Sequence, residues 1–431
     1  MMKRSVLLGA VLSLCPLILA AQGIGATQPA PKSEAALRML RENPNRAGVN
    51  THIYEFREEK NTPPPSGFKY VYLAHYARHG ARNDWRPQHY TYVIDILEKA
   101  DSAGILNGEG RYLLEKTRGV LEEHGGMDGH LTRRGEFEHR EIARRLYSRY
   151  KPVFRHGSKY VRVESTTVPR TLVSMACCVS ELSKLQKDLD FTIDTGEKYM
   201  EILNNGASAE HKKASMVLLD SLRLNTPSDN ETIFRTLFTD PEKAREYVKD
   251  PEKFQKYIFY TARISESAGV ASDLWRVLPE DVIYRWWDWF NRELYIRQGN
   301  SVEFGYERMK RTEPLVEEIV SHADQALSDS SVAADLYFGH DYPVMALAGY
   351  FALEGPGDRM RFDEIPYRYC DPRYVMLGMN IQWVFCRNRK GETLCKIVYN
   401  GEERRVRGLN PVSGPWYRWT DIKNMLSLQE R

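Results

Sequence analysis

Three short apolar runs limit what this chain can fold into more than any other feature of its sequence. They span residues 68–74, 160–164 and 333–338, and their lengths are typical of buried strands. Between the first two runs, Thr132 can cap a helix with an apolar stripe, and residues 168–185 carry a second helical pattern. Strands that alternate with helices indicate an α/β fold with a mostly parallel central sheet.

The organisation changes in the middle of the chain. Strand patterns become rare after residue 190, and helix starts recur. Asp240 and Asp250 each precede a proline, which suits an N-cap followed by the first helical residue. We therefore predict a helical domain inserted into an α/β domain. The predicted parts are a signal peptide (1–21), an N-terminal arm (22–66), an α/β catalytic domain (67–189 and 325–431) and an α-helical insertion (190–324).

The first residues have the pattern of a secretion signal. Lys3 and Arg4 precede an apolar run over residues 6–20, and the small residues Ala20 and Ala21 offer a cleavage site. The run is shorter than a typical transmembrane helix. We therefore expect export, with a periplasmic or secreted protein after cleavage near Ala21 and no transmembrane segment.

The charge balance argues against nucleic-acid binding. The chain has a formal net charge of +3, and cleavage would remove Lys3 and Arg4 and lower it to +1. A dedicated nucleic-acid binder has a clear basic excess. A local basic site for a small anion is still compatible with this balance.

Five cysteines follow the predicted signal peptide, and two of them flank a turn. Cys386 and Cys395 lie on either side of Lys390-Gly391, and a hairpin centred there would set them opposite each other. An oxidising compartment would favour a disulfide between them, although spacing alone does not fix connectivity. None of the cysteine spacings matches a zinc site.

The segment Arg78-His79-Gly80-Ala81-Arg82 follows the first strand run. Two arginines bracket a histidine, and the glycine lets the backbone turn sharply. Guanidinium groups hold a phosphate bidentately and keep their charge at any working pH. A histidine nucleophile that approaches a phosphate dianion needs such charge compensation.

The Arg-His-Gly tripeptide occurs twice in the chain. Arg155-His156-Gly157 repeats it, but this copy precedes a strand run and lacks an arginine two residues after the glycine. Ligand sites of α/β sheets lie beyond the carboxyl ends of strands. We therefore interpret the second copy as a surface loop.

The other two strand runs also end in polar residues. Arg170 follows the run at 160–164, and His340 and Asp341 follow the run at 333–338. The carboxyl ends of parallel strands meet at one edge of a sheet. We therefore expect these three residues to lie beside the first Arg-His-Gly segment.

Together these motifs resemble the histidine acid phosphatases, branch 2 of the histidine phosphatase superfamily. The group includes phytases, multiple inositol polyphosphate phosphatases and periplasmic glucose phosphatases. It carries RHGxRxP after the first core strand and a distal HD or HAE, which match residues 78–82 and 340–341 here. Residues 131–135 resemble its LTxxG element, and the remaining match is an S-x-x-x-x-R-x-x-x-S run at Ser165, Arg170 and Ser174.

One departure from the family pattern concerns the loop after Arg82. The usual motif proline is missing, because Asn83 and Asp84 follow that arginine. Proline would stiffen the loop, so its absence is expected to alter the entry to the site and the substrate range. No reacting group is lost.

The resemblance implies a phosphoglycerate-mutase-like α/β domain with an inserted helical domain, and it implies a mechanism. His79 would attack phosphorus and form a phosphohistidine, while Asp341 would protonate the leaving oxygen and then activate water. No metal or other cofactor is implied. The implied phosphate-binding residues are Arg78, Arg82, Arg170 and His340.

The implied partner is a small-molecule phosphate monoester. Inositol polyphosphates are the leading class, as in a phytase, and sugar phosphates or a broad range of phosphomonoesters are the alternative. The sequence does not predict the oligomeric state. Loop candidates for contacts with further phosphates are Arg86, His124 and His130.

Three other functions need comparison with a phosphatase. A phosphate-transferring mutase disagrees with the signal peptide and the HD dipeptide. A pseudoenzyme that binds phosphorylated ligands disagrees with the retention of every reacting residue. A glycan-binding protein would use the aromatic cluster at residues 286–290, which is more typical of a core. We rank the phosphatase ahead of all three.

Overall fold

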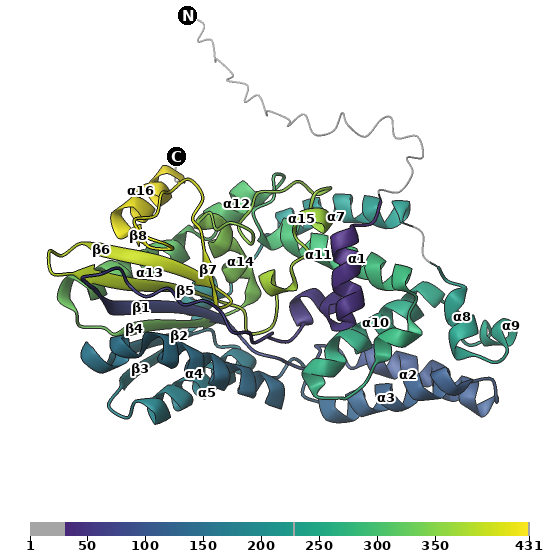
Figure 1. Ribbon diagram of the computed structural model, residues 1–431. Coiled ribbons are helices and arrows are strands. Elements are labelled where there is room, and N and C mark those ends of the chain that lie inside the picture. The colour runs from purple at the N-terminus through teal and green to yellow at the C-terminus, as the bar shows by residue number, and fades with distance from the viewer. Residues whose placement is uncertain (1–30, 227–228, 430–431) are drawn as a thin grey trace, which may run out of the picture. The chain divides into compact units, whose positions relative to one another are not determined.

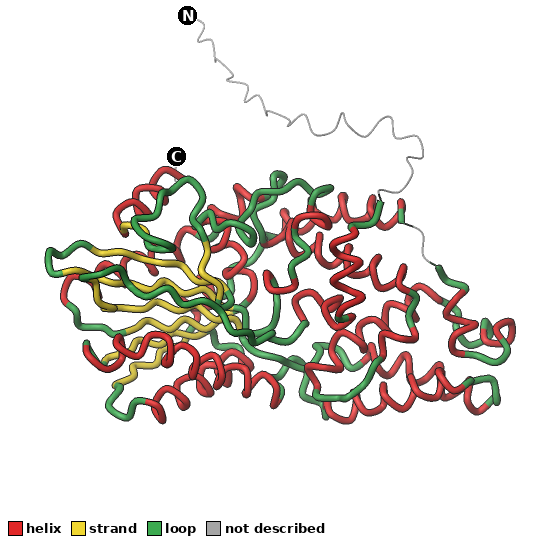
Figure 2. Tube along the Cα trace, in the orientation of Figure 1, coloured by secondary structure: helices red, strands yellow, loops and turns green. Residues whose placement is uncertain are grey.

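The sheet at the centre of the fold contains the three predicted strands. The structure is a computed structural model that describes residues 31–226 and 229–429, so the predicted signal peptide lies outside the described residues. In the described part, eight strands form one sheet in the order β3-β2-β4-β1-β5-β6-β7, and β8 pairs with β6 (Figures 1 and 2). The strands are β1 (Phe68–Arg78), β2 (Tyr160–Ser165), β3 (Asp190–Thr195), β4 (Ala334–Gly339), β5 (Asn380–Asn388), β6 (Thr393–Tyr399), β7 (Glu402–Arg404) and β8 (Tyr417–Arg418).

The sheet has a parallel half and an antiparallel half. Strands β3, β2, β4 and β1 are parallel to one another, and the antiparallel half begins where β5 pairs with β1. Ala334 of β4 pairs with Leu73 of β1 on one side and with Val161 of β2 on the other. The predicted α/β class, with a sheet that is parallel in its core strands, is confirmed.

Helices account for most of the remaining structure. Asp240 caps its helix by accepting from the Lys243 N–H at 3.0 Å, as its Asp-Pro pattern predicts. Asp250 does the same with the Lys253 N–H at 2.9 Å. The helices are α1 (Glu34–Glu42), α2 (Gln88–Ser102), α3 (Gly108–His124), α4 (Arg133–His156), α5 (Pro169–Leu185), α6 (Glu197–Leu203), α7 (Ala209–Asn225), α8 (Thr232–Leu237), α9 (Pro241–Ala244), α10 (Pro251–Ala268), α11 (Glu280–Gln298), α12 (Gly305–Lys310), α13 (Glu313–Asp329), α14 (Asp341–Tyr350), α15 (Ile365–Arg368) and α16 (Trp419–Gln429), with 3-10 turns η2 (Pro44–Thr51), η3 (Leu274–Val277) and η4 (Pro372–Tyr374).

Each face of the sheet is covered by helices. Helices α4 and α5 lie on one face, below the strands in Figure 1, where they pack on Leu73, Val163 and Phe338. Helices α13 and α14 lie against the other face, which includes Tyr72 and Tyr337. This alternation of side chains between two buried faces is the reason that β1 and β4 are apolar along most of their length.

The predicted helical insertion, residues 190–324, opens with the edge strand β3 and is helical after it. Helices α2 and α3, which precede this range, contact α10, so the helical part of the molecule also draws on residues 88–124. Trp286 and Trp287 are buried, which confirms the core interpretation of the aromatic cluster and removes the platform that a glycan-binding surface would need.

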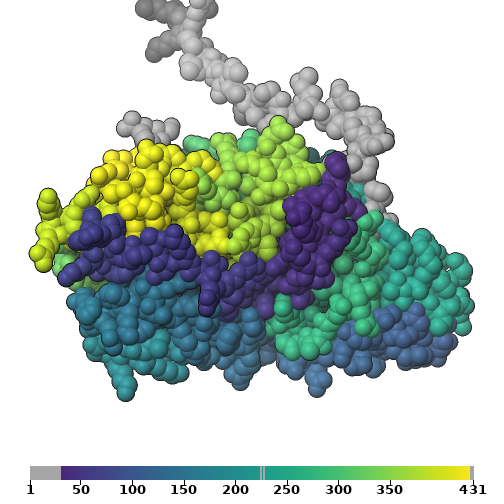
Figure 3. Space-filling view, in the orientation of Figure 1, coloured from purple at the N-terminus to yellow at the C-terminus, as the bar shows by residue number. Residues whose placement is uncertain are grey.

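The segment before β1 is more structured than the predicted arm. Helix α1 buries Leu37 and Leu40, and η2 contacts α10 and α11. Residues 52–66 then cross the surface between the C-terminal part of the chain and α4 (Figure 3). Trp416 anchors this stretch, because its indole N–H donates to the Pro63 carbonyl at 2.9 Å. The polar composition of residues 22–66 concealed these contacts.

The hairpin between β5 and β6 forms as predicted, but its register differs by one residue. Cys395 pairs with Phe385 and Cys386 pairs with Leu394, so the two cysteines point to opposite faces of the sheet. Both are free thiols, and each belongs to a different apolar cluster. The disulfide between them that the sequence left open is therefore not formed.

Crossing a bilayer takes a long and strongly apolar helix. None of the helices within residues 31–226 and 229–429 has that length and apolar character.

Candidate active site

The three predicted strand ends meet at one edge of the sheet. Arg78, the last residue of β1, pairs with Gly339, the last residue of β4. Ser165 at the end of β2 pairs with Phe338 of β4. The three parallel strands therefore deliver their following residues to the same place, as the sequence predicts.

His79 is buried immediately after β1, and its ring orientation is fixed. The Nδ1 atom lies 2.9 Å from the Gly80 carbonyl, which can only accept, so Nδ1 carries the proton and Nε2 keeps its lone pair. Burial and then the charges of Arg78 and Arg170 hold the pKa of His79 well below its usual value. The imidazole is therefore neutral, and the lone pair of its Nε2 is available for bonding.

Arg82 and Arg170 form a positive cluster around this ring. Burial, followed by repulsion from the other arginines, lowers the pKa of Arg170 to about 9. Burial also lowers the pKa of Arg82 to about 10. Among the described residues, no carboxylate forms an ion pair with either guanidinium within 4.0 Å. Two buried cations without an acidic partner favour an anion as ligand.

Arg78 is the one arginine of this group with an acidic partner in the described structure. Its Nη2 atom lies 3.1 Å from Asp341 Oδ2, and its Nη1 donates to the carbonyls of Asn50 and Met376. The Asn50 side-chain amide donates to the same Asp341 oxygen at 2.9 Å. The carboxylate of Asp341 is thus oriented by two donors at the start of α14.

His340 lies beside His79, with ring centroids 5.6 Å apart. Arg170 donates to its Nδ1 at 3.3 Å, so the remaining proton of the ring belongs on Nε2. Burial and the Arg170 charge lower the pKa of His340 to about 3, and the ring is neutral under ordinary conditions. A neutral His340 can donate one hydrogen bond from Nε2 to an anion.

The loop that carries His79 is held by a glycine-glycine contact. A Cβ atom on Gly80 would meet the Cα and carbonyl oxygen of Gly135 at 2.7 Å, and a Cβ on Gly135 would meet the Ala81 oxygen at 2.2 Å. Thr132 caps α4 and donates to the same Ala81 oxygen. These contacts give the LTxxG element at residues 131–135 a structural role beneath the loop.

Two further side chains hold the backbone of this loop. The buried carboxylate of Glu138 accepts from the Ala81 N–H at 2.7 Å and from the Tyr54 N–H at 3.0 Å. Ser174 accepts from the Gly80 N–H at 3.1 Å and donates to the Arg170 carbonyl. Ser174 therefore connects the loop to α5, which explains the second serine of the S-x-x-x-x-R-x-x-x-S run.

Hydrogen bonds take the place of the missing motif proline. Asp84 accepts from the Trp85 N–H at 2.7 Å and from the His89 ring at 2.8 Å, and its carbonyl accepts from Gly129. The Asn83 N–H donates to the His130 carbonyl at 2.9 Å. The loop is thus fixed by its own contacts with the segment at residues 123–130.

The loop residues named as contacts for further phosphates have different environments. His124 is buried and bonds Asp128 at 2.7 Å, so it holds the loop rather than facing a ligand. Arg86 is exposed and His130 is half-buried. The second tripeptide, residues 155–157, is exposed as predicted, although it ends helix α4 rather than lying in a loop.

Sequence reasoning missed two residues close to the arginine cluster. Trp85 is half exposed, and the guanidinium carbons of Arg170 and Arg82 lie 4.4 and 5.1 Å from its ring centroid. Arg263 of α10 is near enough to lower the pKa of Arg82 and Arg78. The missing motif proline marks the loop that contains Trp85 but not the residue itself, and nothing in the helical sequence of α10 marks Arg263.

Comparison with known families and structures agrees with this arrangement. Residues 74–180 match the sequence model of the histidine phosphatase superfamily (branch 2). The chain is similar to the multiple inositol polyphosphate phosphatase of Bifidobacterium longum in complex with phosphate, with a TM-score of 0.73, 15% identity, and coverage of 90% of this chain and 98% of that one. For the complex of that protein with inositol hexasulfate, the TM-score is 0.69, with 15% identity and coverage of 88% and 97%.

A phytase is also similar in structure. The phytase of D. castellii aligns with a TM-score of 0.66 and 12% identity over 90% of this chain and 86% of its own. No curated protein sequence matches the chain. At these identities the structural likeness shows the fold.

Proposed function

From its match to branch 2 of the histidine phosphatase superfamily, which confirms the resemblance of its motifs, we propose that this chain hydrolyses phosphate monoesters through a phosphohistidine intermediate. The observation that carries the proposal is the neutral His79 with a free Nε2, buried beside Arg82 and Arg170, which have no acidic partner among the described residues. A phosphoryl group supplies the negative charge that this cluster lacks.

In the first step, Nε2 of His79 attacks phosphorus in line and the bond from phosphorus to the ester oxygen breaks. Arg82, Arg170 and the Nε2–H of His340 receive the non-bridging oxygens, whose charge is spread over the transition state. The proton stays on Nδ1 and its hydrogen bond to the Gly80 carbonyl stabilises the positive charge that develops on the ring.

The proton for the leaving alcohol comes from Asp341. A bound phosphate competes with the Asp341 carboxylate for Arg78, which now holds it at 3.1 Å. Once Arg78 turns to the phosphate, Asp341 loses a charged partner and can carry a proton to the ester oxygen. In the second step Asp341 takes a proton from water, the water oxygen bonds to phosphorus, and His79 is released with inorganic phosphate.

We propose inositol polyphosphates as the substrate class, because positive charge continues beyond the catalytic cluster. Arg263 lies over the rings of Tyr260 and Phe290 at 5.1 and 4.8 Å, and no described carboxylate pairs with it within 4.0 Å. The charge of Arg263 lowers the pKa of Arg78 and of Arg82, which indicates that Arg263 lies on the same side of the site. A substrate with several phosphates would bind more tightly through a contact with this cation, whereas a substrate with one phosphate would not.

The test is phosphate release from inositol hexakisphosphate and from glucose 1-phosphate, from about pH 3 to about pH 8 with EDTA present. Wild type is compared with His79→Gln and with His156→Gln, the exposed histidine of the second tripeptide. Release that disappears only in His79→Gln supports the proposed chemistry. Release that survives in His79→Gln, or that neither substrate gives, contradicts it.

The substrate class has its own test in Arg263→Gln. We expect KM for inositol hexakisphosphate to rise about 10-fold, the size of one charge-assisted contact, while KM for glucose 1-phosphate stays the same. A preference for glucose 1-phosphate in wild type, or an equal change for both substrates, would favour a sugar-phosphate or broad-specificity phosphatase.

The same proposal includes export. Residues 1–21 have the pattern of a signal peptide, and their removal near Ala21 leaves the whole of the site described above. N-terminal sequencing of the protein from the medium or the periplasm tests this, and a retained N-terminus in the cytoplasm would contradict it.

A further inference from the structure

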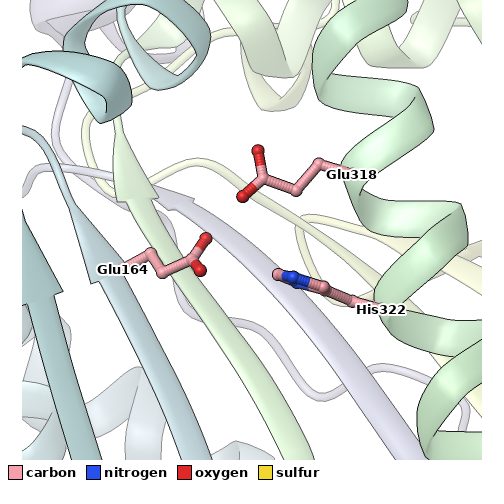
Figure 4. A group of neighbouring side chains, drawn as sticks. All are labelled: Glu164, Glu318 and His322. Atoms are coloured by element: carbon pink, nitrogen blue, oxygen red, sulfur yellow. The ribbon is translucent and has the colours of Figure 1, made fainter.

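A second cluster of ionisable side chains lies on the face of the same strands. Glu164 belongs to β2, and Glu318 and His322 lie one turn apart on α13, which covers that face. One oxygen of each carboxylate and one ring nitrogen lie within 4.8 Å of one another. Figure 4 shows the two carboxylates and the imidazole directed toward one another between the sheet and the helix.

Glu164 lacks a partner that could neutralise it. Its side chain is only 8% exposed, and no described group donates a hydrogen bond to its Oε2 atom. The nearby cations are engaged elsewhere: Arg162 binds Asp335 at 2.5 and 3.1 Å, and Lys198 pairs with Asp194 at 3.9 Å. A buried carboxylate oxygen without a donor or cation is costly, so this position favours a positive ligand.

A hydrogen bond to β4 holds the ring of His322. Its Nδ1 lies 2.8 Å from the Tyr337 hydroxyl of β4. When Nδ1–H donates to the tyrosine oxygen, Nε2 keeps a lone pair for a cation, and the second bond of the ring fixes its orientation. Glu318 and His322 are half-buried, which leaves a route from solvent.

We propose that Glu164, Glu318 and His322 bind a divalent transition-metal ion, with Zn²⁺ as the ion that best suits two carboxylates and one imidazole. Water completes the coordination. The site is structural, because it joins β2 to α13 on the face of the sheet. The inference does not depend on the proposed phosphatase activity.

The proposed metal site lies close to the ends of β2 and β4, so a bound ion would stabilise the position of these strand ends. Glu164 is two residues before Thr166, whose N–H donates to the Phe338 carbonyl and whose hydroxyl lies 3.5 Å from His340. Helix α13 leads directly into β4, which precedes His340. A bound ion therefore holds together the two elements that lead to Arg170 and His340.

Without a metal ion, a proton is the competing occupant. Burial and the neighbouring Glu318 raise the pKa of Glu164, which favours a proton shared between the two carboxyls. The experiment must separate these two occupants.

The test is Zn²⁺ binding by the full protein after treatment with EDTA and desalting. We expect one Zn²⁺ per chain by calorimetry and by elemental analysis, and an unfolding midpoint that rises with Zn²⁺ concentration. Glu318→Gln and His322→Gln should each bind Zn²⁺ at least about 10-fold more weakly. The matched control is Glu317→Gln, an exposed neighbour on the same helix, which should bind as wild type does.

Two results would overturn the proposal. One is an unfolding midpoint that rises on acidification but does not respond to Zn²⁺, which would assign the cluster to a shared proton. The other is Zn²⁺ binding that Glu318→Gln and His322→Gln leave unchanged. Both variants are conservative and half-buried, and their circular dichroism verifies that they are folded. Phosphate release in EDTA is measured separately, so a failure of this proposal is distinct from a failure of the proposed function.

Discussion

The chain contains the tripeptide Arg-His-Gly twice, and the two copies have opposite surroundings. In the first, Arg78, His79 and Gly80 are buried at the end of a parallel strand, against Gly135. In the second, residues 155–157 are exposed at the end of α4, before β2 begins. The same three residues thus make a candidate catalytic site in one place and a solvated helix end in the other. The position of the tripeptide relative to the sheet, more than its local sequence, decides which of these two roles it has.

The largest difference between the copies should appear when their histidines are replaced. His79→Gln should lower kcat/KM at least about 10³-fold, because the amide of glutamine cannot replace the imidazole as a nucleophile. His156→Gln should change it less than about twofold. Both are measured as initial rates of phosphate release at the optimal pH, with the fold checked by circular dichroism. Equal effects of the two substitutions would remove the distinction between the copies.

The first copy has the carboxylate of Asp341 beside it, and Asp341→Asn tests whether that carboxylate transfers a proton. For an alkyl phosphate, kcat should fall about 10²- to 10⁴-fold, because the leaving alcohol must gain a proton. For p-nitrophenyl phosphate, whose leaving group departs without protonation, the loss should be much smaller. A loss of the same size for both substrates would mean that Asp341 orients Arg78 and does not transfer a proton.

The arginines allow the next comparison. Arg170→Gln should lower kcat about 10²- to 10³-fold, the usual cost of removing one preorganised donor to the transition state. Arg155→Gln, in the exposed copy, should leave kcat unchanged. A change confined to KM in Arg170→Gln would show that this residue binds ground state and transition state equally.

Replacing the glycine of each copy by alanine should change the stability of the protein to different extents. Gly80→Ala places a Cβ 2.7 Å from backbone atoms of Gly135, so we expect the free energy of unfolding to fall by about 1–3 kcal/mol. For Gly157→Ala the nearest atom would be the Val153 oxygen at 3.6 Å, an ordinary contact, and the change should stay within about 0.5 kcal/mol. Urea unfolding of both variants measures the difference. Equal values would show that the glycine-glycine contact does not constrain the loop.

The last comparison concerns pH and the strand behind the first copy. Burial lowers the pKa of His75 to about 3, below its value of 6.5 in the unfolded chain. The unfolded state therefore binds the extra proton first, so this contribution to stability is complete above about pH 6.5 and is lost as the pH falls toward about 3. His75→Leu should make the acid-side decline of the unfolding free energy shallower, by up to about 1.4 kcal/mol per pH unit. An unchanged slope would contradict the burial of a neutral ring.

Much of this architecture follows from local patterns in the sequence. The runs at residues 68–74 and 333–338 predicted β1 and β4 because buried parallel strands are short, apolar and bounded by turns. The meeting of their ends was predictable because parallel strands in an α/β sheet share one edge. The caps at Asp240 and Asp250 were predictable because each aspartate precedes a proline, which suits an N-cap followed by the first helical residue.

Other features depend on contacts between distant segments. The hairpin register between Cys386 and Cys395 differs by one residue from the prediction, because the packing of both sheet faces sets the pairing. Arg263 and Trp85 carry no motif, and only the packing of α10 and of the loop after Arg82 brings them to the arginines. The Glu164 cluster joins residues more than 150 positions apart, which no spacing rule detects.

The most direct test of the central claim is the location of the phosphoryl group during turnover. The protein is mixed with a substrate labelled at phosphorus, quenched in alkali, which preserves phosphohistidine, and digested for mass spectrometry. The account predicts label on the peptide that contains His79, none on the peptide that contains His156, and no label in His79→Gln. Label on another residue, or turnover without any labelled peptide, would contradict a phosphohistidine at the end of β1.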